Sequence, residues 1–207
     1  MIEIRIHGRG GQGAVMASQI LIMAAAKEGK KVQAFPLFGP ERRGAPVAAF
    51  ARVDDKKIWI HSQVYAPDCV IVLHPVLYKQ VDVTAGLKPG GWVILNSSQA
   101  PSSLPFPAHF KVAVVDASAI AINHKLGSRS EPMVNTAILG AFARVTGIVG
   151  IEALTETIRE TVRVKGEENE VAAREAFEAV KVREGSILDL RVEERKNPAY
   201  RPHVKNG

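Results

Sequence analysis

Short apolar runs separated by glycine and proline dominate the first half of the chain. The isoleucines within residues 2–6 alternate with charged residues, and this period of two predicts a strand. The runs 70–73, 93–95 and 112–115 are almost entirely apolar, which is typical of strands that are covered on both faces. The pattern therefore predicts a sheet that is buried between other layers.

Longer apolar segments with helical spacing follow the first strand and occupy the second half of the chain. Residues 14–28 are rich in alanine, leucine, isoleucine and methionine, and Gly29 stands where a helix C-terminal cap is expected. Three further helices are predicted for 133–145, 151–164 and 167–182. Strands early and helices late are typical of an α/β layer fold.

Two segments make the predicted sheet mixed. Residues 31–35 suit a second strand, and the apolar run 47–53 precedes four charged residues at 54–57. We expect these charged residues to form the turn of a hairpin that continues into 58–60, so that part of the sheet is antiparallel. The predicted fold is α/β and three-layer, with a mostly parallel (mixed) sheet, helices on both faces and a Rossmann-like glycine turn.

The composition changes after the last predicted helix. Residues 183–207 mix charges with prolines and hold few apolar residues that could join a core. We expect 1–182 to form one domain and 183–207 to be an extension that becomes ordered by lying on a partner. Within the domain, Gly140 in the helix 133–145 predicts close packing against a neighbouring element.

Composition and charge narrow the class of protein. The chain has 207 residues, of which 46% are hydrophobic and 23% charged, the balance of an ordinary globular protein. Neither a membrane span nor a secretory signal is visible, so we expect a cytoplasmic protein. The net charge of +6 favours an acidic ligand or partner. Dispersed basic residues and an aromatic content of 6% disfavour nucleic acid.

The sequence offers few side chains that could bind a metal ion or an iron–sulfur cluster. Its single cysteine, Cys69, lies in an apolar run and is expected to be a buried structural thiol. Iron–sulfur clusters need about four ligands, so this chain alone is expected to hold none. The histidines lack the paired spacing of metal sites.

The strongest local motif lies between the first strand and the first helix. Residues 7–13 read His-Gly-Arg-Gly-Gly-Gln-Gly, in which Gly8, Gly10 and Gly13 fit G-x-G-x-x-G. Such glycines allow close approach to the backbone, and free amides at the helix start attract an anion such as phosphate. A dinucleotide also needs an acidic residue at the end of the second strand, and 32–36 contain none. A tight strand-to-helix crossing without a ligand explains the same glycines.

A second motif is the loop 38–46, in which Arg42 and Arg43 stand between prolines and glycines. Arginine forks bind phosphate or carboxylate, although adjacent surface arginines are commonly just solvated. Loops that follow the first two strands of an α/β sheet leave the same edge. We therefore expect Arg9, Arg42 and Arg43 to share one anion-facing surface. The alternative is that these arginines pair with carboxylates of a partner subunit.

Together, these segments resemble the gamma subunit of pyruvate:ferredoxin oxidoreductase. The family begins with a strand, H-G-R-G-G-Q-G and a helix, as residues 7–13 do, and continues with F-G-x-E-R-R-G-A-P-V, as in 38–47. The connecting strand 31–36 and an N-T-x-x-L-G-A helix start at 135–141 also match. The likeness covers residues 1–182.

The resemblance implies one subunit of a multi-subunit oxidoreductase that interconverts pyruvate and acetyl-coenzyme A. Thiamine diphosphate, Mg²⁺ and [4Fe-4S] clusters would reside on alpha, beta and delta-type partner subunits, with coenzyme A as co-substrate and ferredoxin or another electron acceptor. This chain would bind no cofactor alone, would hold no catalytic residue, would serve assembly and would cover the active site or the coenzyme A site. Contacts with an anion, coenzyme A or an interface are expected from Gly8, Arg9, Gly10, Gly11, Gln12, Gly13, Glu41, Arg42, Arg43 and Asn135.

Three alternatives stay open at this point. The chain could serve a related enzyme for 2-oxoglutarate or for an aromatic 2-oxoacid such as phenylglyoxylate or indolepyruvate, because the tail after Val182 is longer than the family leads one to expect. It could be a free-standing enzyme that binds a nucleotide with its glycine loop. A regulatory binder of nucleotides or nucleic acid is the third class.

Overall fold

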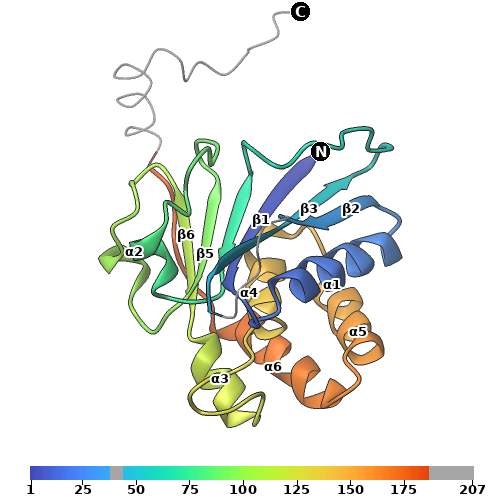
Figure 1. The fold of residues 1–207 in the computed structure, drawn as a ribbon, viewed down its shortest axis with the longest axis vertical. Helices are drawn as coiled ribbons and strands as arrows, with labels where there is room; N and C mark the ends of the chain where they lie inside the picture. The colour runs from blue at the N-terminus through green and yellow to red at the C-terminus, as the bar shows by residue number, and fades with distance from the viewer. Residues whose placement is uncertain (38–43, 187–207) are drawn as a thin grey trace, which may run out of the picture.

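A seven-stranded sheet forms the centre of the molecule (Figure 1). The computed structural model describes residues 1–37 and 44–186. The strands are β1 (Ile2–Arg9), β2 (Lys31–Pro36), β3 (Pro46–Asp54), β4 (Cys69–Val72), β5 (Trp92–Asn96), β6 (Lys111–Val115) and β7 (Lys181–Arg183).

The spatial order of the strands is β2-β3-β1-β4-β5-β6-β7. β1, β4, β5 and β6 pair in parallel with their neighbours in this series. β3 is antiparallel to both β1 and β2, and β7 is antiparallel to β6. The mixed α/β sheet that the sequence predicts is confirmed, with the parallel strands at its centre and the antiparallel pairings at its edges.

The two faces of the sheet are covered unequally. One face packs against five helices, which are α1 (Ala14–Lys27), α3 (Ala117–Asn123), α4 (Ala137–Thr146), α5 (Ile151–Thr161) and α6 (Gly166–Ala179). Among the described residues, the other face carries only α2 (Leu77–Gln80), the 3₁₀ turn η1 (Pro101–Ser103) and loops. No helix in the described ranges is long and apolar enough to cross a membrane.

Two glycines act at helices as predicted. Gly29 closes α1 with φ of +81°, and the amides of Gly29 and Lys30 donate to carbonyls in the last turn of the helix. Gly140 lies where α4 crosses α6, and a Cβ there would come within 1.8 Å of the carbonyl oxygen of Ala173. The close packing predicted for Gly140 is confirmed.

The hairpin predicted around 54–57 is wrong, because residues 58–60 form no strand. The antiparallel part of the sheet comes from β3 with β1 and β2 instead. The guanidinium of Arg52 is almost fully buried and donates to the carbonyl oxygens of Ile60 at 3.3 Å and Ser62 at 2.6 Å. Backbone acceptors that bind an arginine are not available to a neighbouring strand.

The chain returns to the sheet after α6. The helix predicted over 167–182 ends before the short strand β7, which pairs with β6. Arg183 donates to the carbonyl oxygen of Phe106 at 3.1 Å, and the amide of Ser186 donates to that of Ala108 at 2.8 Å. The first residues of the expected extension therefore pack against the domain, and its remainder lies outside the described residues.

Candidate anion site at the carboxyl edge of the sheet

The glycine loop joins β1 to α1 through two residues with positive φ. Gly11 has φ of +93° and Gly13 has φ of +76°, values that favour glycine. A Cβ on Gly11 would meet nothing within 4 Å, whereas one on Gly13 would lie 2.6 Å from Nδ2 of Asn135. Gly11 thus serves the turn, and Gly13 serves both the turn and the close approach of a side chain.

Two other residues of the motif hold the loop itself. Gly8 lies within β1, where a Cβ would come 3.2 Å from side-chain atoms of both Ala14 and Leu73. Oε1 of Gln12 accepts from the amide of Arg9 at 2.8 Å, and the amide of Gln12 donates to the carbonyl oxygen of Arg9 at 2.9 Å. Gly8 and Gln12 therefore shape the turn.

Asn135 brings an unpaired amide to the start of α1. Its side chain is 2% exposed, and Nδ2 has no hydrogen-bond partner within the described part of the chain. It lies against Gly13, the N-cap of α1. Because glycine has no side chain, the first amides of α1 receive no side-chain cap. The first amides of a helix are free donors, and a buried donor without an acceptor is costly. The arrangement suits an acceptor such as an anion.

The glycine loop forms one wall of a cavity of about 990 Å³. The cavity opens beyond the carboxyl ends of β1, β4 and β5, which is where α/β sheets form ligand crevices. Another part of its wall is the segment 127–134, between α3 and α4. The polar side chains in its lining are two arginines, one carboxylate and six neutral groups, namely Arg9, Arg129, Glu131, Gln12, His74, Asn96, Ser118, Ser128 and Ser130.

The wall 127–134 was missed by sequence reasoning. Gly127 has φ of +78°, and a Cβ there would lie 2.4 Å from the carbonyl oxygen of Glu131. The amide of Ser128 donates to that same carbonyl oxygen at 3.1 Å, which closes a tight turn that carries Arg129. The glycine followed by Ser-Arg-Ser was a usable turn signal, but nothing local indicates that it faces the glycine loop.

The floor of the cavity is a satisfied polar cluster. Asn96, at the end of β5, donates through Nδ2 to the carbonyl oxygen of Leu73 and to Oγ of Ser118, each at 2.9 Å. Its Oδ1 accepts from the amide of Ser118 at 3.1 Å. Asn96 therefore joins the ends of two strands to the start of α3 and leaves no free donor.

The positive charge of the cavity comes from arginine. Burial and the nearby guanidinium of Arg9 hold the pKa of His74 below its ordinary value. Its Nδ1 accepts from the amide of Val76 at 3.3 Å, so His74 is neutral at neutral pH. Arg9 and Arg129 are the cations in the lining.

The described end of the arginine loop is bonded to the glycine loop. The amide of Gly10 donates to the carbonyl oxygen of Ala45 at 2.8 Å, and the amide of Gly44 donates to that of Gly10 at 3.1 Å. Nε of Arg9 donates to the carbonyl oxygen of Gly44 at 3.0 Å. The two loops thus meet at one edge of the sheet. Glu41, Arg42 and Arg43 lie outside the described residues, and their part in a shared anion surface stays a prediction.

No group of three or more metal-binding side chains lies together within residues 1–37 and 44–186. Cys69 is buried in β4, and burial raises the pKa of its thiol far above the ordinary value. The expected role of Cys69 as a buried structural thiol is therefore supported.

Residues 3–179 match the family described as pyruvate ferredoxin/flavodoxin oxidoreductase. The chain belongs to this family. A relative from Thermococcus litoralis, the common subunit gamma of pyruvate/ketoisovalerate oxidoreductases, is 55% identical over 89% of this chain and 100% of its own length. Pyruvate synthase subunit PorC of Methanocaldococcus jannaschii is 52% identical over 86% of this chain and 96% of its own.

The fold of the family is also known from a crystal structure. Pyruvate oxidoreductase subunit PORC of Thermotoga maritima aligns with a TM-score of 0.74 and 37% identity, over 88% of this chain and 98% of the other. The resemblance stated for the motifs at 7–13 and 38–47 is therefore confirmed. Membership of this family favours an oxidoreductase subunit over a free-standing nucleotide-binding enzyme.

Proposed function

We propose that this chain is the gamma-type subunit of a cytoplasmic pyruvate:ferredoxin oxidoreductase. Its match to gamma and PorC subunits over nearly their whole length supports this role. The Thermococcus relative is named as common to pyruvate and ketoisovalerate enzymes, so a gamma chain of this type serves more than one 2-oxoacid there. In this proposal, the choice of 2-oxoacid lies with the partner subunits.

The proposed division of labour places the redox cofactors elsewhere. Thiamine diphosphate, Mg²⁺ and [4Fe-4S] clusters belong to alpha, beta and delta-type subunits, and ferredoxin or another acceptor takes the electrons. One cysteine is too few for a cluster. The isolated chain is therefore expected to show no turnover of pyruvate with coenzyme A and an artificial acceptor, and measurable turnover would contradict this division.

We further propose that the cavity receives the phosphate-bearing part of coenzyme A. The observation that supports this step is the unpaired Nδ2 of Asn135 against Gly13, at the start of α1. Each of these two residues directly follows a residue of the cavity lining, Val134 and Gln12. A volume of about 990 Å³ is at the upper end of the range of ligand pockets, so it suits a large co-substrate. Arg9 and Arg129 both line the cavity, and in this proposal their guanidinium groups neutralise phosphates of the ligand.

Kinetics of the assembled complex test the coenzyme A site. Arg129→Ala removes one cation from the cavity without touching the glycine loop. The apparent KM for coenzyme A should rise about tenfold, which corresponds to the loss of one charged hydrogen bond. The double substitution Arg42→Ala and Arg43→Ala should act in the same direction if these residues join the surface.

The control is Arg163→Ala, an exposed arginine in the loop between α5 and α6 that does not line the cavity, and it should leave that KM unchanged. A complex that fails to assemble, with unchanged coenzyme A dependence in the fraction that does, would favour the alternative in which these arginines pair with a partner's carboxylates.

A further inference from the structure

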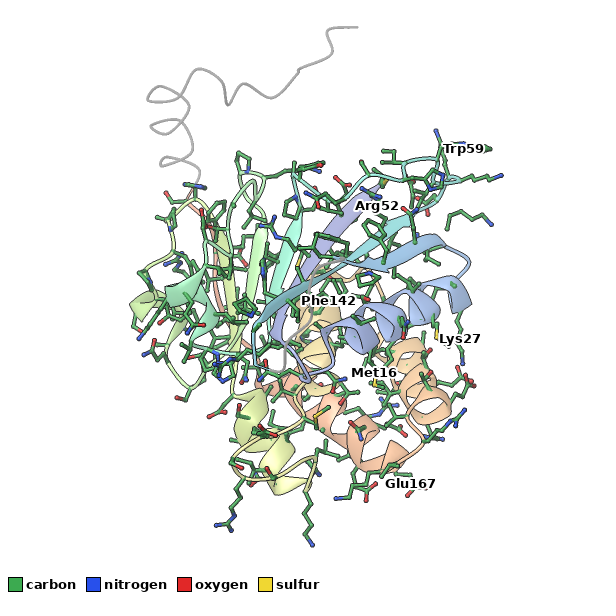
Figure 2. All side chains as sticks on the ribbon, viewed as in Figure 1. Met16, Lys27, Arg52, Trp59, Phe142 and Glu167 are labelled. Carbon is green, nitrogen blue, oxygen red and sulfur yellow. The ribbon has the colours of Figure 1, made fainter. Side chains whose placement is uncertain are left out.

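Three large apolar side chains project into solvent at the amino edge of the sheet, opposite the cavity. Trp59 is 71% exposed, Tyr65 is 68% exposed and Ile60 is 44% exposed. Figure 2 shows Trp59 at an outer corner of the molecule, beyond the end of β3. We call these three residues the Trp59 platform. Single exposed apolar residues are ordinary, but two exposed aromatic residues on one loop, as here, favour an interaction surface, because aromatic residues are enriched at interfaces.

The backbone beneath the platform is held by the core. The buried Arg52 binds the carbonyl oxygens of Ile60 and Ser62. Val64, between the exposed positions, is 2% exposed and packs with Phe35 and Phe50. A loop that is already ordered loses little entropy on binding, and aromatic residues on such a loop carry most of the binding energy of an interface.

The carboxylates near the platform are already paired. Asp54 lies 3.1 Å from the ammonium of Met1, and Asp55 lies 2.7 Å from that of Lys30. Both carboxylates are therefore paired with cations of the same chain.

The cations on the rim are available to a partner. The ammonium of Lys57 lies 4.0 Å from the ring centre of Trp59, and Lys56 is exposed and makes no side-chain ion pair within the described ranges. A second copy of this chain would bring the same cations against its own, and each copy carries a net charge of +6. Like charges at an interface are unfavourable, whereas a partner with carboxylates complements the rim.

We propose that the Trp59 platform docks into an apolar pocket, rimmed by carboxylates, on another subunit of the same oxidoreductase. This inference rests on the proposed gamma-subunit function, because that function supplies the partner. Attachment through the amino edge leaves the carboxyl edge, with the cavity, free to face the substrate.

The test uses the full chain assembled with its partner subunits. The double substitution Trp59→Ser and Tyr65→Ser should raise the dissociation constant of the complex about 30-fold or more, as measured by native mass spectrometry over a dilution series. Lys56→Glu with Lys57→Glu should weaken assembly as well and should reduce its dependence on salt. The apparent KM for coenzyme A of the fraction that assembles should stay unchanged.

The matched control is Val164→Ser, because Val164 is 74% exposed in the loop between α5 and α6. It should assemble as the unsubstituted chain does. Assembly of the Trp59 and Tyr65 variant with unchanged affinity overturns the inference but leaves the proposed function standing. Loss of a homodimer of the isolated chain in that variant identifies a second copy as the occupant and also overturns it. Failure of the unsubstituted chain to assemble with any subunit overturns the proposed function itself.

Discussion

The two edges of the sheet differ in whether their buried polar groups have hydrogen-bond partners. At the carboxyl edge, Gly10, Gly11, Gly44 and Gly127 line a hollow. The side-chain amide nitrogen of Asn135, which lies against Gly13 at the start of α1, is buried without an acceptor in the described part of the chain. At the amino edge, the buried guanidinium of Arg52 is supplied with acceptors, including Oε1 of Glu3 at 2.9 Å and Oε1 of Gln33 at 2.9 Å. The carboxyl edge thus has a cavity and a nearby hydrogen-bond donor without an acceptor, whereas the buried cation of the amino edge has acceptors within the chain.

This contrast shows which partner each edge suits. A hollow with unused donors recognises a small anionic ligand, since the ligand supplies the missing acceptors. A filled edge with protruding aromatic side chains has no room for such a ligand and suits a macromolecular surface instead. If both proposals hold, the sheet separates ligand binding from subunit attachment, and β1 runs between the two edges from Ile2 to Arg9.

The largest expected change in stability comes from replacing Arg52, the buried cation at the amino edge. Arg52→Met leaves the largely buried carboxylate of Glu3 without its partner, which should lower the free energy of unfolding by about 3–5 kcal/mol. Chemical denaturation of the isolated chain measures this. Arg129→Met at the cavity serves as the comparison and should change stability by less than about 0.5 kcal/mol. Equal effects of the two substitutions would remove the contrast between the edges.

The next effect concerns the glycine loop. Gly13→Ala combines a strained positive φ with a contact to Asn135, and should cost about 2–4 kcal/mol. Gly11→Ala keeps the strain without the contact and should cost only about 1 kcal/mol. Both are measured by denaturation. If the two costs are the same, the approach of Asn135 to Gly13 is not energetically important.

Acidification should lower the stability of the fold through His7 in β1, the strand that runs between the two edges. Burial, together with the neighbouring Arg5 charge, lowers the pKa of His7 from 6.5 to about 4, and Nε2 of His7 accepts from Nε of Arg5 at 3.0 Å. The unfolded chain therefore takes up a proton first as the pH falls. Stability that is fully present above about pH 6.5 should be lost toward pH 4, by roughly 1–3 kcal/mol.

The variant His7→Gln isolates this contribution, because glutamine does not titrate. Its free energy of unfolding should depend less steeply on pH between 7 and 4, the window of the shifted pKa. Asp82 is the nearby carboxylate that opposes the shift, so Asp82→Asn should steepen the dependence. An unchanged slope in His7→Gln would show that another group is responsible.

The smallest effect on stability is expected from the end of the chain. Truncation after Ser186 keeps the contacts of Arg183 and Ser186 with the domain and should change stability by less than about 0.5 kcal/mol, while weakening assembly if the extension docks on a partner. Truncation after Val182 removes those contacts and should cost more. If the chain that ends at Ser186 unfolds, the extension belongs to the core.

The local pattern of apolar and polar residues was enough to predict most helices and strands. The apolar runs at 70–73, 93–95 and 112–115 became β4, β5 and β6 because each strand is covered on both faces. Gly29 caps α1 because glycine adopts a positive φ without steric cost, which is a property of the residue itself. The helix α3 was missed although Asp116 caps it through a hydrogen bond of 2.9 Å to the amide of Ala119. A seven-residue helix is too short to show clear periodicity.

The sequence by itself determined most strands and helices, the turn at the glycine motif and the family, because each depends on residues that are close together along the chain. The tertiary structure alone decided that Arg9 and Arg129 line one cavity, that Asn135 meets Gly13, and that Arg52 binds the segment after β3 instead of allowing a hairpin. Those contacts join distant segments, and their partners are chosen by strand order and packing, which no local pattern encodes.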